Sequence, residues 1–302
     1  MNIRDLGYLV ALHEHRHFGR AAEASDCSQP TLSTQVRKLE TELGVELVER
    51  GSRQVLFTAV GERIVRRARR ILAEAGEIRE IARQVHSPNG GTIRLGAFPT
   101  LAPYLLPHVI GSLTRGFPDL EILLVEEKTE ELLAQLRAGS LDAALVALPQ
   151  DDAALHVEPL FREEFVLATP VGHRLAELPG PLRSAQAADD LLLLADGHCL
   201  RDQALEVCRM SGVQERKGFQ ATSLETLRLM VAAGVGVTLM PRLSVAPPVV
   251  RNPGIALREL QAPAPYREIA LVRRASSVQR DLIDEMAGVL RGALPADVRP
   301  LP

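Results

Sequence analysis

Residues 28–34 read Ser28-Gln29-Pro30-Thr31-Leu32-Ser33-Thr34 and decide how the first part of the chain folds. Serine is a good helix N-cap because its hydroxyl accepts a backbone N–H bond, and proline suits a first helical turn. We therefore predict a helix from Thr31 to Leu43, ended by Gly44. Apolar side chains would face inward and polar ones outward. The inward positions are Leu32, Val36, Leu39 and Leu43, and the outward positions are Thr31, Ser33, Thr34, Arg37 and Lys38.

Two helices are predicted ahead of this one, over residues 3–16 and 20–24, with a turn at residues 26–29. A short alanine-rich helix, a tight turn and a helix that opens with small polar side chains are what a helix-turn-helix requires. The sequence therefore predicts binding to double-stranded DNA. The candidates for base-edge contact are Gln29, Thr31, Ser33 and Thr34, and those for phosphate or groove contact are Arg37, Arg50 and Arg53. Pro30 is expected to belong to the same DNA-binding surface. Each of them also fits a solvated helix surface.

The residue pattern of 48–56 alternates on either side of a predicted turn at Gly51-Ser52, and this predicts a small hairpin, or wing. Thr58 would then cap a long helix that runs to about residue 86. Its apolar residues recur four and three positions apart, a heptad pattern typical of coiled coils, so we expect residues 59–87 to hold a homodimer together. A helix packed only on its own domain is the alternative. The predicted seam consists of Ile64, Ala68, Ile71, Ala75, Ile78, Ala82 and Val85.

Short apolar strands alternate with helices from Thr92 onward, after a linker-like Ser-Pro-Asn-Gly-Gly at residues 87–91. The alternation is typical of a doubly wound α/β fold, here with a second unit that would begin near Phe165. Ligands of such folds bind beyond the carboxyl ends of strands, where we expect Thr100, Thr129, His198 and Ser223. The expected divisions are a winged helix-turn-helix domain at 1–58, a dimerisation helix at 59–87 and a two-lobed regulatory domain at 88–302, with lobe I at about 92–161 and 268–302 and lobe II at about 162–267.

A second distinctive stretch is Gly197-His198-Cys199-Leu200-Arg201-Asp202-Gln203, followed by Cys208. Apolar residues at helical spacing predict a helix from Cys199 to Met210. Over nine residues a helix rises about 13.5 Å and turns the two thiols to opposite faces. A disulfide needs Cα atoms about 4.4–6.8 Å apart. Linking Cys199 to Cys208 would therefore require this helix to melt.

The composition limits the classes of protein to which the chain can belong. Three cysteines are too few for a secreted disulfide framework and lack zinc-site spacing, so we expect no metal and no cofactor. No signal-like segment or apolar run of about 18 residues is present, which predicts a cytoplasmic protein that does not bind a membrane. The net charge is −3, but residues 1–87 hold 14 Lys+Arg against 12 Asp+Glu, a balance that permits nucleic-acid binding there.

Several of these motifs together resemble the LysR-type transcriptional regulators. They are Ala21-Ala22, Ser28–Ser33, Leu39-Glu40, Leu43-Gly44, Arg50, Arg53, Thr58, Ala221-Thr222-Ser223 and Gly234–Val237. Residues 197–203 with Cys208 are similar to the hydrogen-peroxide sensors of that family. The resemblance covers nearly the full chain and implies a homotetramer, a dimer of dimers, on promoter DNA, with RNA polymerase as a candidate partner. It also implies a switch by an intramolecular Cys199–Cys208 disulfide. Cys27 and Gly218 depart from the pattern.

Cys199 is expected to react with peroxide as a thiolate, which a helix start and nearby His198 and Arg201 would favour. The resemblance implies that Thr100 and Thr129 bind the peroxide. His198 and Asp202 could orient it and help protonate the departing hydroxide. The alternatives are a buried inert cysteine, threonines that only cap helices, a loop histidine and an aspartate that complements the helix dipole. Cys27 is interpreted as a core residue of the helix-turn-helix.

Oxidation of Cys199 to a sulfenic acid, followed by condensation with Cys208, would repack the helix and shift a dimer interface that touches it. The leading hypothesis is thus a peroxide-sensing transcription regulator and not an enzyme. A LysR-type regulator with an organic effector between its lobes stays open as an alternative. A thiol peroxidase is a third hypothesis, which the helix-turn-helix and the long helix disfavour. They also disfavour a periplasmic solute-binding protein, which shares the two-lobed pattern.

Overall fold

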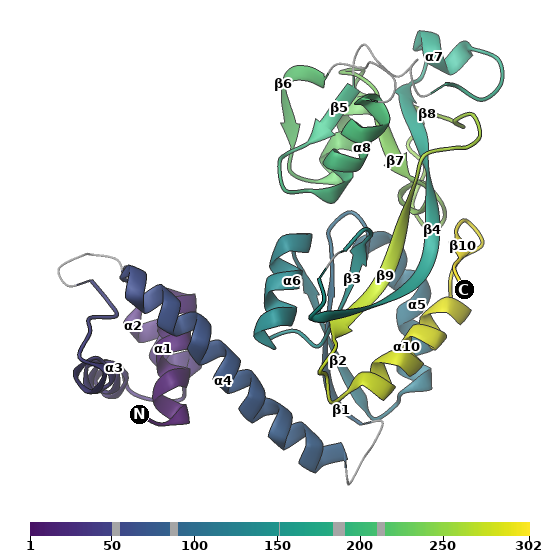
Figure 1. The fold of residues 1–302 in the computed structure, drawn as a ribbon. Coiled ribbons are helices and arrows are strands. Elements are labelled where there is room, and N and C mark those ends of the chain that lie inside the picture. Colours follow the sequence, from purple (N-terminus) through teal and green to yellow (C-terminus); the bar gives the residue numbers. More distant parts are fainter. Residues whose placement is uncertain (50–54, 85–89, 151, 184–190, 210–214) are drawn as a thin grey trace. The chain divides into compact units, whose positions relative to one another are not determined.

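The structure is a computed structural model of the 302-residue chain, and it describes all residues except 50–54, 85–89, 151, 184–190 and 210–214 (Figure 1). Met1–Ser87 form one compact unit, and Pro88–Leu136 with Leu141–Pro302 form the second. Each unit is built around hydrophobic cores of its own. None of the helices that the structure describes combines the length and the apolarity that a membrane crossing requires.

The described residues of the first unit form four helices and a short antiparallel pair. The helices are α1 (Ile3–His15), α2 (Phe18–Ala24), α3 (Gln29–Leu43) and α4 (Ala59–Gln84). Helix α3 starts two residues earlier than predicted because Ser28 is its N-cap and accepts a 3.3 Å hydrogen bond from the Thr31 amide. Leu32, Val36 and Leu39 are buried in the core, as predicted. The inward placement of Leu43 is wrong: it is 37% exposed at the last turn, next to the left-handed Gly44.

The residues that flank the predicted wing pair in antiparallel fashion. The Glu49 amide donates to the Leu56 carbonyl at 2.8 Å, and Val48 forms a bridge with Phe57. Arg50, Arg53 and the Gly51-Ser52 turn lie outside the described residues. The predicted cap of the next helix is confirmed, since the Gly61 amide donates to Thr58 Oγ1 at 2.9 Å.

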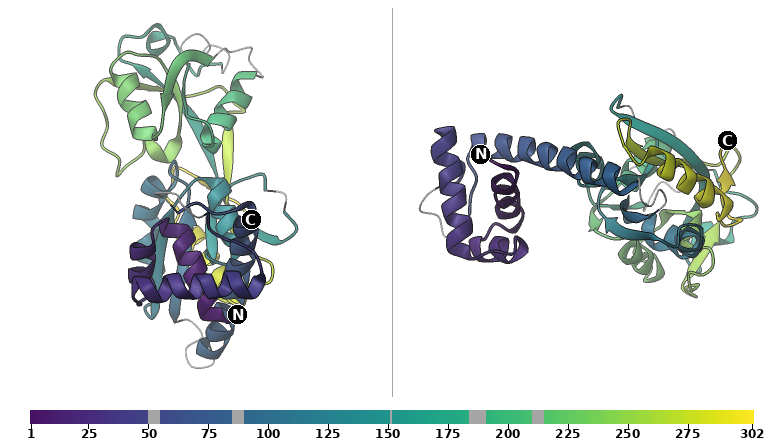
Figure 2. Two further views of the ribbon diagram at one scale, coloured as in Figure 1. Left: turned by 90° about the vertical axis from the view of Figure 1, so that its left-hand side faces the viewer. Right: turned by 90° about the horizontal axis from the view of Figure 1, so that it is seen from below.

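Helix α4 packs on the first unit with its initial turns only. Val65 and Ala68 are buried there, whereas Ile71 is 44% and Ile78 is 68% exposed. The second half of α4 extends beyond the other three helices of its unit (Figure 2). The predicted seam is therefore divided. Its start belongs to the core of the unit, and Ile71, Ile78 and Ala82 further along are exposed. Val85 lies outside the described residues.

A polar cluster joins α4 to α1. Nε2 of His13 lies 2.9 Å from Oε2 of Glu62, and the Arg16 guanidinium donates to the same carboxylate at 3.1 Å. Burial alone would raise the pKa of Glu62, but these hydrogen bonds lower it below its ordinary value. The first turns of α4 are therefore fixed to α1 by charge as well as by apolar packing.

The lower lobe of the second unit, lobe I, is a sheet covered by helices. Its strands are β1 (Gly91–Ala97), β2 (Leu120–Glu126), β3 (Ala143–Ala147) and parts of β4 (Leu155–Pro170) and β9 (Tyr266–Arg274), and its helices are α5 (Ala102–Gly116), α6 (Thr129–Ala138) and α10 (Arg280–Gly292). Strand β1 is parallel to β2 and β3, while β9 runs antiparallel to β3. The β1–α5 and β2–α6 junctions, which carry Thr100 and Thr129, consequently lie at the same edge of the sheet.

Strands β4 and β9 run side by side and pass through both lobes (Figure 1). The first ten residues of β4 pair with β9, and residues 165–170 pair with β7 (Thr238–Pro241) and β8 (Ile255–Arg258). The predicted start of a second unit near Phe165 falls within this strand of 16 residues. Leu160 and Phe161 of the strand pack in the core of lobe I, whereas Phe165–Ala168 pack in the core of lobe II. Charged residues and Pro159 interrupt the apolar pattern of β4, so the sequence shows only its second half as a strand.

Lobe II has its own apolar core, which includes the four leucines of β5 (Leu191–Leu194). Strand β5 pairs in parallel with β6 (Glu215–Ala221). The other elements are α7 (Arg174–Glu177), α8 (Cys199–Arg209), α9 (Leu224–Ala232) and the 3₁₀ turn η2 (Arg242–Ser244), and β10 (Arg299–Pro300) pairs with β4 near the end of the chain. Helix α8 directly follows β5, and its first residue is Cys199.

Candidate redox site

Cys199 begins α8 after a tight turn that only glycine accommodates easily. Gly197 has φ +84°, in the left-handed region, and a Cβ there would lie 3.0 Å from Nζ of Lys128. The turn directs His198 and Cys199 back toward lobe I. The thiol of Cys199 is half-buried and free.

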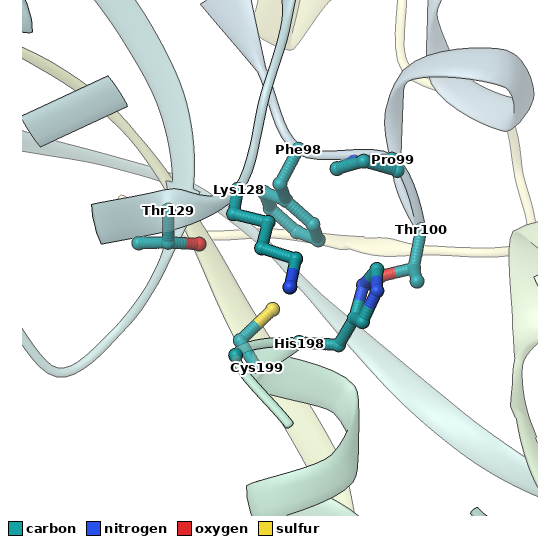
Figure 3. Close-up of a pocket in the computed structure, with 8 residues that line it drawn as sticks. Phe98, Pro99, Thr100, Lys128, Thr129, His198 and Cys199 are labelled. Carbon is teal, nitrogen blue, oxygen red and sulfur yellow. The ribbon is translucent and has the colours of Figure 1, made fainter. Parts of the chain in front are cut away.

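A small pocket surrounds this thiol (Figure 3). Three segments that are distant in sequence supply its walls: the β1–α5 junction, the β2–α6 junction and the turn before α8. The lining residues are Phe98, Pro99, Thr100, Lys128, Thr129, Gly197, His198 and Cys199. The structure therefore brings together four residues predicted for the site, namely Thr100, Thr129, His198 and Cys199.

Arg267 of β9 is fully buried and binds Thr100 of the pocket, and no pattern in the sequence predicts this contact. Its Nε donates to Oε2 of Glu163 at 2.7 Å, and neither side chain has exposed surface. Its terminal nitrogens donate to Oγ1 of Thr100 at 3.2 Å and to the Thr100 carbonyl at 3.0 Å. The buried cation thus fixes the orientation of the Thr100 hydroxyl. Because that oxygen accepts from arginine, its own hydrogen can be donated into the pocket.

Burial raises the pKa of the Cys199 thiol above its ordinary value, and the charge of Asp202 adds to this effect. Arg267, the Thr129 hydroxyl and the Leu200 amide oppose the shift without overcoming it. The helix start favours the thiolate through the Leu200 amide, but removal of the thiol from water outweighs this effect, so the net pKa of Cys199 is raised.

Thr129 supplies the second hydroxyl of the pocket. Its Oγ1 is buried and has no hydrogen-bond partner among the described residues. It lies near enough to the Cys199 thiol to lower the pKa of that group, although the contact falls short of hydrogen-bond geometry. A buried hydroxyl without a partner is unfavourable, so this group is available to a small polar ligand.

His198 is only 7% exposed. Burial lowers its pKa below the ordinary value, and the charge of Lys128 lowers it further. The imidazole is therefore neutral near pH 7. The expectation that His198 adds positive charge beside the thiol is wrong.

Arg201 and Asp202 do not line the pocket. The Nε of Arg201 pairs with Asp196 at 2.9 Å, and its Nη1 donates to the Leu194 carbonyl at 3.1 Å, so it braces the turn from within lobe II. Asp202 is exposed and disfavours the thiolate. Ser223 is also outside the pocket, where it caps α9 by accepting from the Thr226 amide at 3.1 Å.

Cys208 lies in the same continuous helix as Cys199, which runs to Arg209. Met210, the predicted last residue, falls outside the described residues, as does the placement of the Cys208 side chain. Nine residues of intact helix separate the two cysteine Cα atoms by about 13.5 Å along the helix axis, well beyond disulfide range.

The predicted DNA contacts of α3 are at the surface of the first unit. Gln29, Pro30, Thr31, Thr34 and Arg37 are exposed, and Ser33 is half-buried. Cys27 packs against the core of this unit. No group of three or more metal-binding side chains comes together within the described ranges.

The chain matches two protein-family profiles. Residues 3–62 match the bacterial regulatory helix-turn-helix protein, lysR family, and residues 86–295 match the LysR substrate binding domain. It is 48% identical over 294 residues to the DNA-binding transcriptional dual regulator OxyR of Escherichia coli K12, an alignment that covers 97% of this chain and 96% of that protein.

Two solved structures are similar along nearly the whole chain. A full-length OxyR variant from Pseudomonas aeruginosa has a TM-score of 0.79 and 38% identity and covers 98% of both chains. A Corynebacterium glutamicum OxyR mutant bound to H₂O₂ has a TM-score of 0.66 and 35% identity, and covers 97% of this chain and 92% of that one. The chain therefore belongs to the LysR-type transcriptional regulators, in the OxyR group of hydrogen peroxide-inducible gene activators.

Proposed function

We propose that this regulator senses hydrogen peroxide at Cys199 and that a reversible Cys199–Cys208 disulfide changes its binding to promoter DNA. The observation that carries the proposal is the placement of one thiol in a small pocket with two hydroxyls, while the second cysteine is nine residues along the same helix. The structure of the Corynebacterium glutamicum mutant with bound H₂O₂ adds support, since it shares this fold.

The first step oxidises one sulfur by two electrons. The Cys199 thiol loses its proton, its sulfur attacks one oxygen of the peroxide, and the O–O bond breaks. The departing hydroxide takes up a proton and leaves as water, so Cys199 becomes a sulfenic acid. Thr100 can donate to the peroxide, and Thr129 can donate or accept because its hydroxyl is unpaired. Arg267 favours the thiolate at the moment of attack.

The second step joins the two sulfurs. The Cys208 thiol loses its proton, its sulfur attacks the sulfenic sulfur, and the S–O bond breaks as the disulfide forms. The departing hydroxide takes up a proton and leaves as water. The bond cannot form across an intact α8, so α8 must unwind between its two ends. Unwinding removes Cys199 from the pocket and exposes part of the lobe II core, which contains Leu200 and Ala204 of the same helix. Oxidation is thereby converted into a change of shape.

DNA binding is proposed for α3 with the wing. Gln29, Thr31, Ser33 and Thr34 would contact base edges, and Arg37, Arg50 and Arg53 would contact phosphates or a groove. Pro30 would lie at the same surface. The exposed seam of α4 supports a homodimer through residues 59–87, and we propose the homotetramer and contact with RNA polymerase by analogy with the family. A regulator of promoters acts in the cytoplasm.

Peptide mapping without reductant, before and after one equivalent of H₂O₂, tests the central step. We expect a Cys199–Cys208 linked peptide after oxidation, none in Cys199→Ser, and a sulfenic acid on Cys199 in Cys208→Ser. Promoter binding should change on oxidation in the unaltered protein only. Peroxide-dependent switching that survives in Cys199→Ser would refute the proposal, while sustained turnover of peroxide with a thiol reductant would indicate a thiol peroxidase.

A further inference from the structure

Lys128 extends from lobe I to the turn that carries the reactive cysteine. It precedes α6, and its Nζ donates a 3.0 Å hydrogen bond to the carbonyl oxygen of Asp196 in lobe II. Its side chain also crosses Gly197, where a Cβ would lie 3.0 Å from Nζ and 3.4 Å from Cδ. Figure 3 shows the ammonium group between the Thr129 and His198 sides of the pocket.

Two cations hold this turn from opposite sides. Arg201 binds it from lobe II, through the Asp196 carboxylate at 2.9 Å and the Leu194 carbonyl at 3.1 Å. Lys128 binds it from lobe I, through the Asp196 carbonyl. Arg201 lies within α8 and moves with lobe II, whereas Lys128 is anchored next to Thr129. The lysine therefore sets how the two threonine walls of the pocket face the thiol.

We infer that Lys128 is a positioning residue, a latch between the lobes that holds the Asp196–Gly197 turn against the β2–α6 junction and so keeps Cys199 in its peroxide pocket. The inference rests on the proposed function, because it concerns the reaction of Cys199 with peroxide. The hydrogen bond from Lys128 to Asp196 does not depend on which oxidant reacts. Reaction requires the thiol and the hydroxyls to be aligned within a fraction of an ångström. Loss of the latch lets the turn move relative to Thr129 and exposes the thiol.

The latch also brings charge into the pocket. Its ammonium group lowers the pKa of His198, in addition to the larger effect of burial. The other charges that act on the Cys199 thiol are those of Arg267 on β9 and Asp202 on α8, and the turn before α8 carries the Asp196–Arg201 ion pair. The titration of His198 therefore reports directly whether the lysine occupies the place that the structure shows.

The test compares Lys128→Met and Lys128→Arg with the unaltered full-length protein. Because the hydrogen bond is at the surface, we expect Lys128→Met to slow the oxidation of Cys199 by H₂O₂ roughly three- to tenfold. Alkylation of Cys199 by iodoacetamide should become faster, since the thiol is more accessible. The pKa of His198, followed by NMR, should rise. Lys128→Arg should restore all three properties toward their original values.

Arg280→Met is the matched control, since it removes an exposed cation from α10, which contributes nothing to the pocket. It should leave the three measurements unchanged. If Lys128→Met leaves the oxidation rate, the alkylation rate and the His198 pKa unaltered, the proposal that Lys128 positions Cys199 is wrong. If the unaltered protein itself fails to react with H₂O₂, the proposed function is wrong. The alkylation and NMR measurements then still test whether Lys128 positions Cys199.

Discussion

Arg267 and Glu163 form a 2.7 Å ion pair with no exposed surface on either side chain, directly behind the pocket of Cys199. The carboxylate also accepts from the Leu243 amide at 2.7 Å, and the guanidinium binds Thr100. One buried pair thus ties together β4, β9, η2 and the start of α5. The contact of Arg267 with Thr100 holds the reactive pocket, and the contact of Glu163 with the Leu243 amide holds the segment after β7.

Glu163→Gln should destabilise the regulatory domain by about 3–5 kcal/mol, because it leaves a buried cation without its counter-ion. Chemical denaturation measures the loss. Glu268→Gln provides the control, since Glu268 pairs with the half-exposed Arg162 and should cost less than about 1 kcal/mol. Equal losses in the two variants would contradict the role of burial.

Thr129→Val should shift the pH profile of Cys199 alkylation to higher pH. The hydroxyl of Thr129 lowers the pKa of the thiol, and its removal leaves burial less opposed. Rates measured with iodoacetamide across neutral and alkaline pH give the pKa in each variant. Thr114→Val, which removes a hydroxyl on the exposed side of α5, should not shift the profile. A shift toward lower pH in Thr129→Val would contradict the structure.

The stability of the regulatory domain should fall in acid through His198. Its pKa in the folded protein lies below the ordinary value of 6.5 because burial disfavours the charged ring. The unfolded chain therefore binds the proton first, and stability that is complete above pH 6.5 is lost as pH falls through the folded pKa. Thermal unfolding at several pH values should show a weaker acid dependence in His198→Gln than in the exposed His156→Gln.

Charge placed on the seam of α4 should dissociate the proposed homodimer. Ile71 and Ile78 are exposed in the single chain, so Ile71→Asp with Ile78→Asp should leave the fold intact and lower the dimer affinity by at least 100-fold, about 2.7 kcal/mol. Analytical ultracentrifugation provides the measurement. Val250→Asp alters a more exposed apolar residue in the other unit and should have no effect. A stable dimer in the seam variant would show that other surfaces hold the subunits together.

Arg37→Gln should weaken promoter binding about equally for all sequences and reduce the slope of log affinity against log salt by about 1, as expected for the loss of one phosphate contact. Binding titrations at several salt concentrations test this. Gln29→Ala should instead relax the preference for particular bases. An unchanged salt slope for Arg37→Gln would place that side chain away from the DNA.

Capping and periodicity were sufficient to predict most of the first unit. Ser28 and Thr58 cap the helices that they were expected to cap, and the buried face of α3 follows the spacing of Leu32, Val36 and Leu39. These features depend on residues within one or two helical turns. The strand that joins the lobes was recognised only in part, because half of β4 carries charged residues whose partners lie on β9.

The sequence predicts most of the residues that line the reactive pocket, but it does not predict the burial and the charged neighbours of these residues. Thr100, Thr129, His198 and Cys199 were expected together, and the structure places them together. Arg267 and Lys128 were missed, and Arg201 was expected at the thiol but binds Asp196. No local signal identifies an arginine 167 positions from the threonine that it binds.

The sequence by itself determined the helix-turn-helix, the heptad seam of α4 and the spacing of two cysteines along one helix, because backbone preferences and side-chain periodicity act over short stretches of chain. Only the tertiary structure decided the protonation of the pocket. Burial makes the Cys199 thiol less acidic and keeps His198 neutral, while Arg267 and Lys128 supply the positive charge. Desolvation and long-range charge are properties of the space around a residue, and the folded chain alone sets that space.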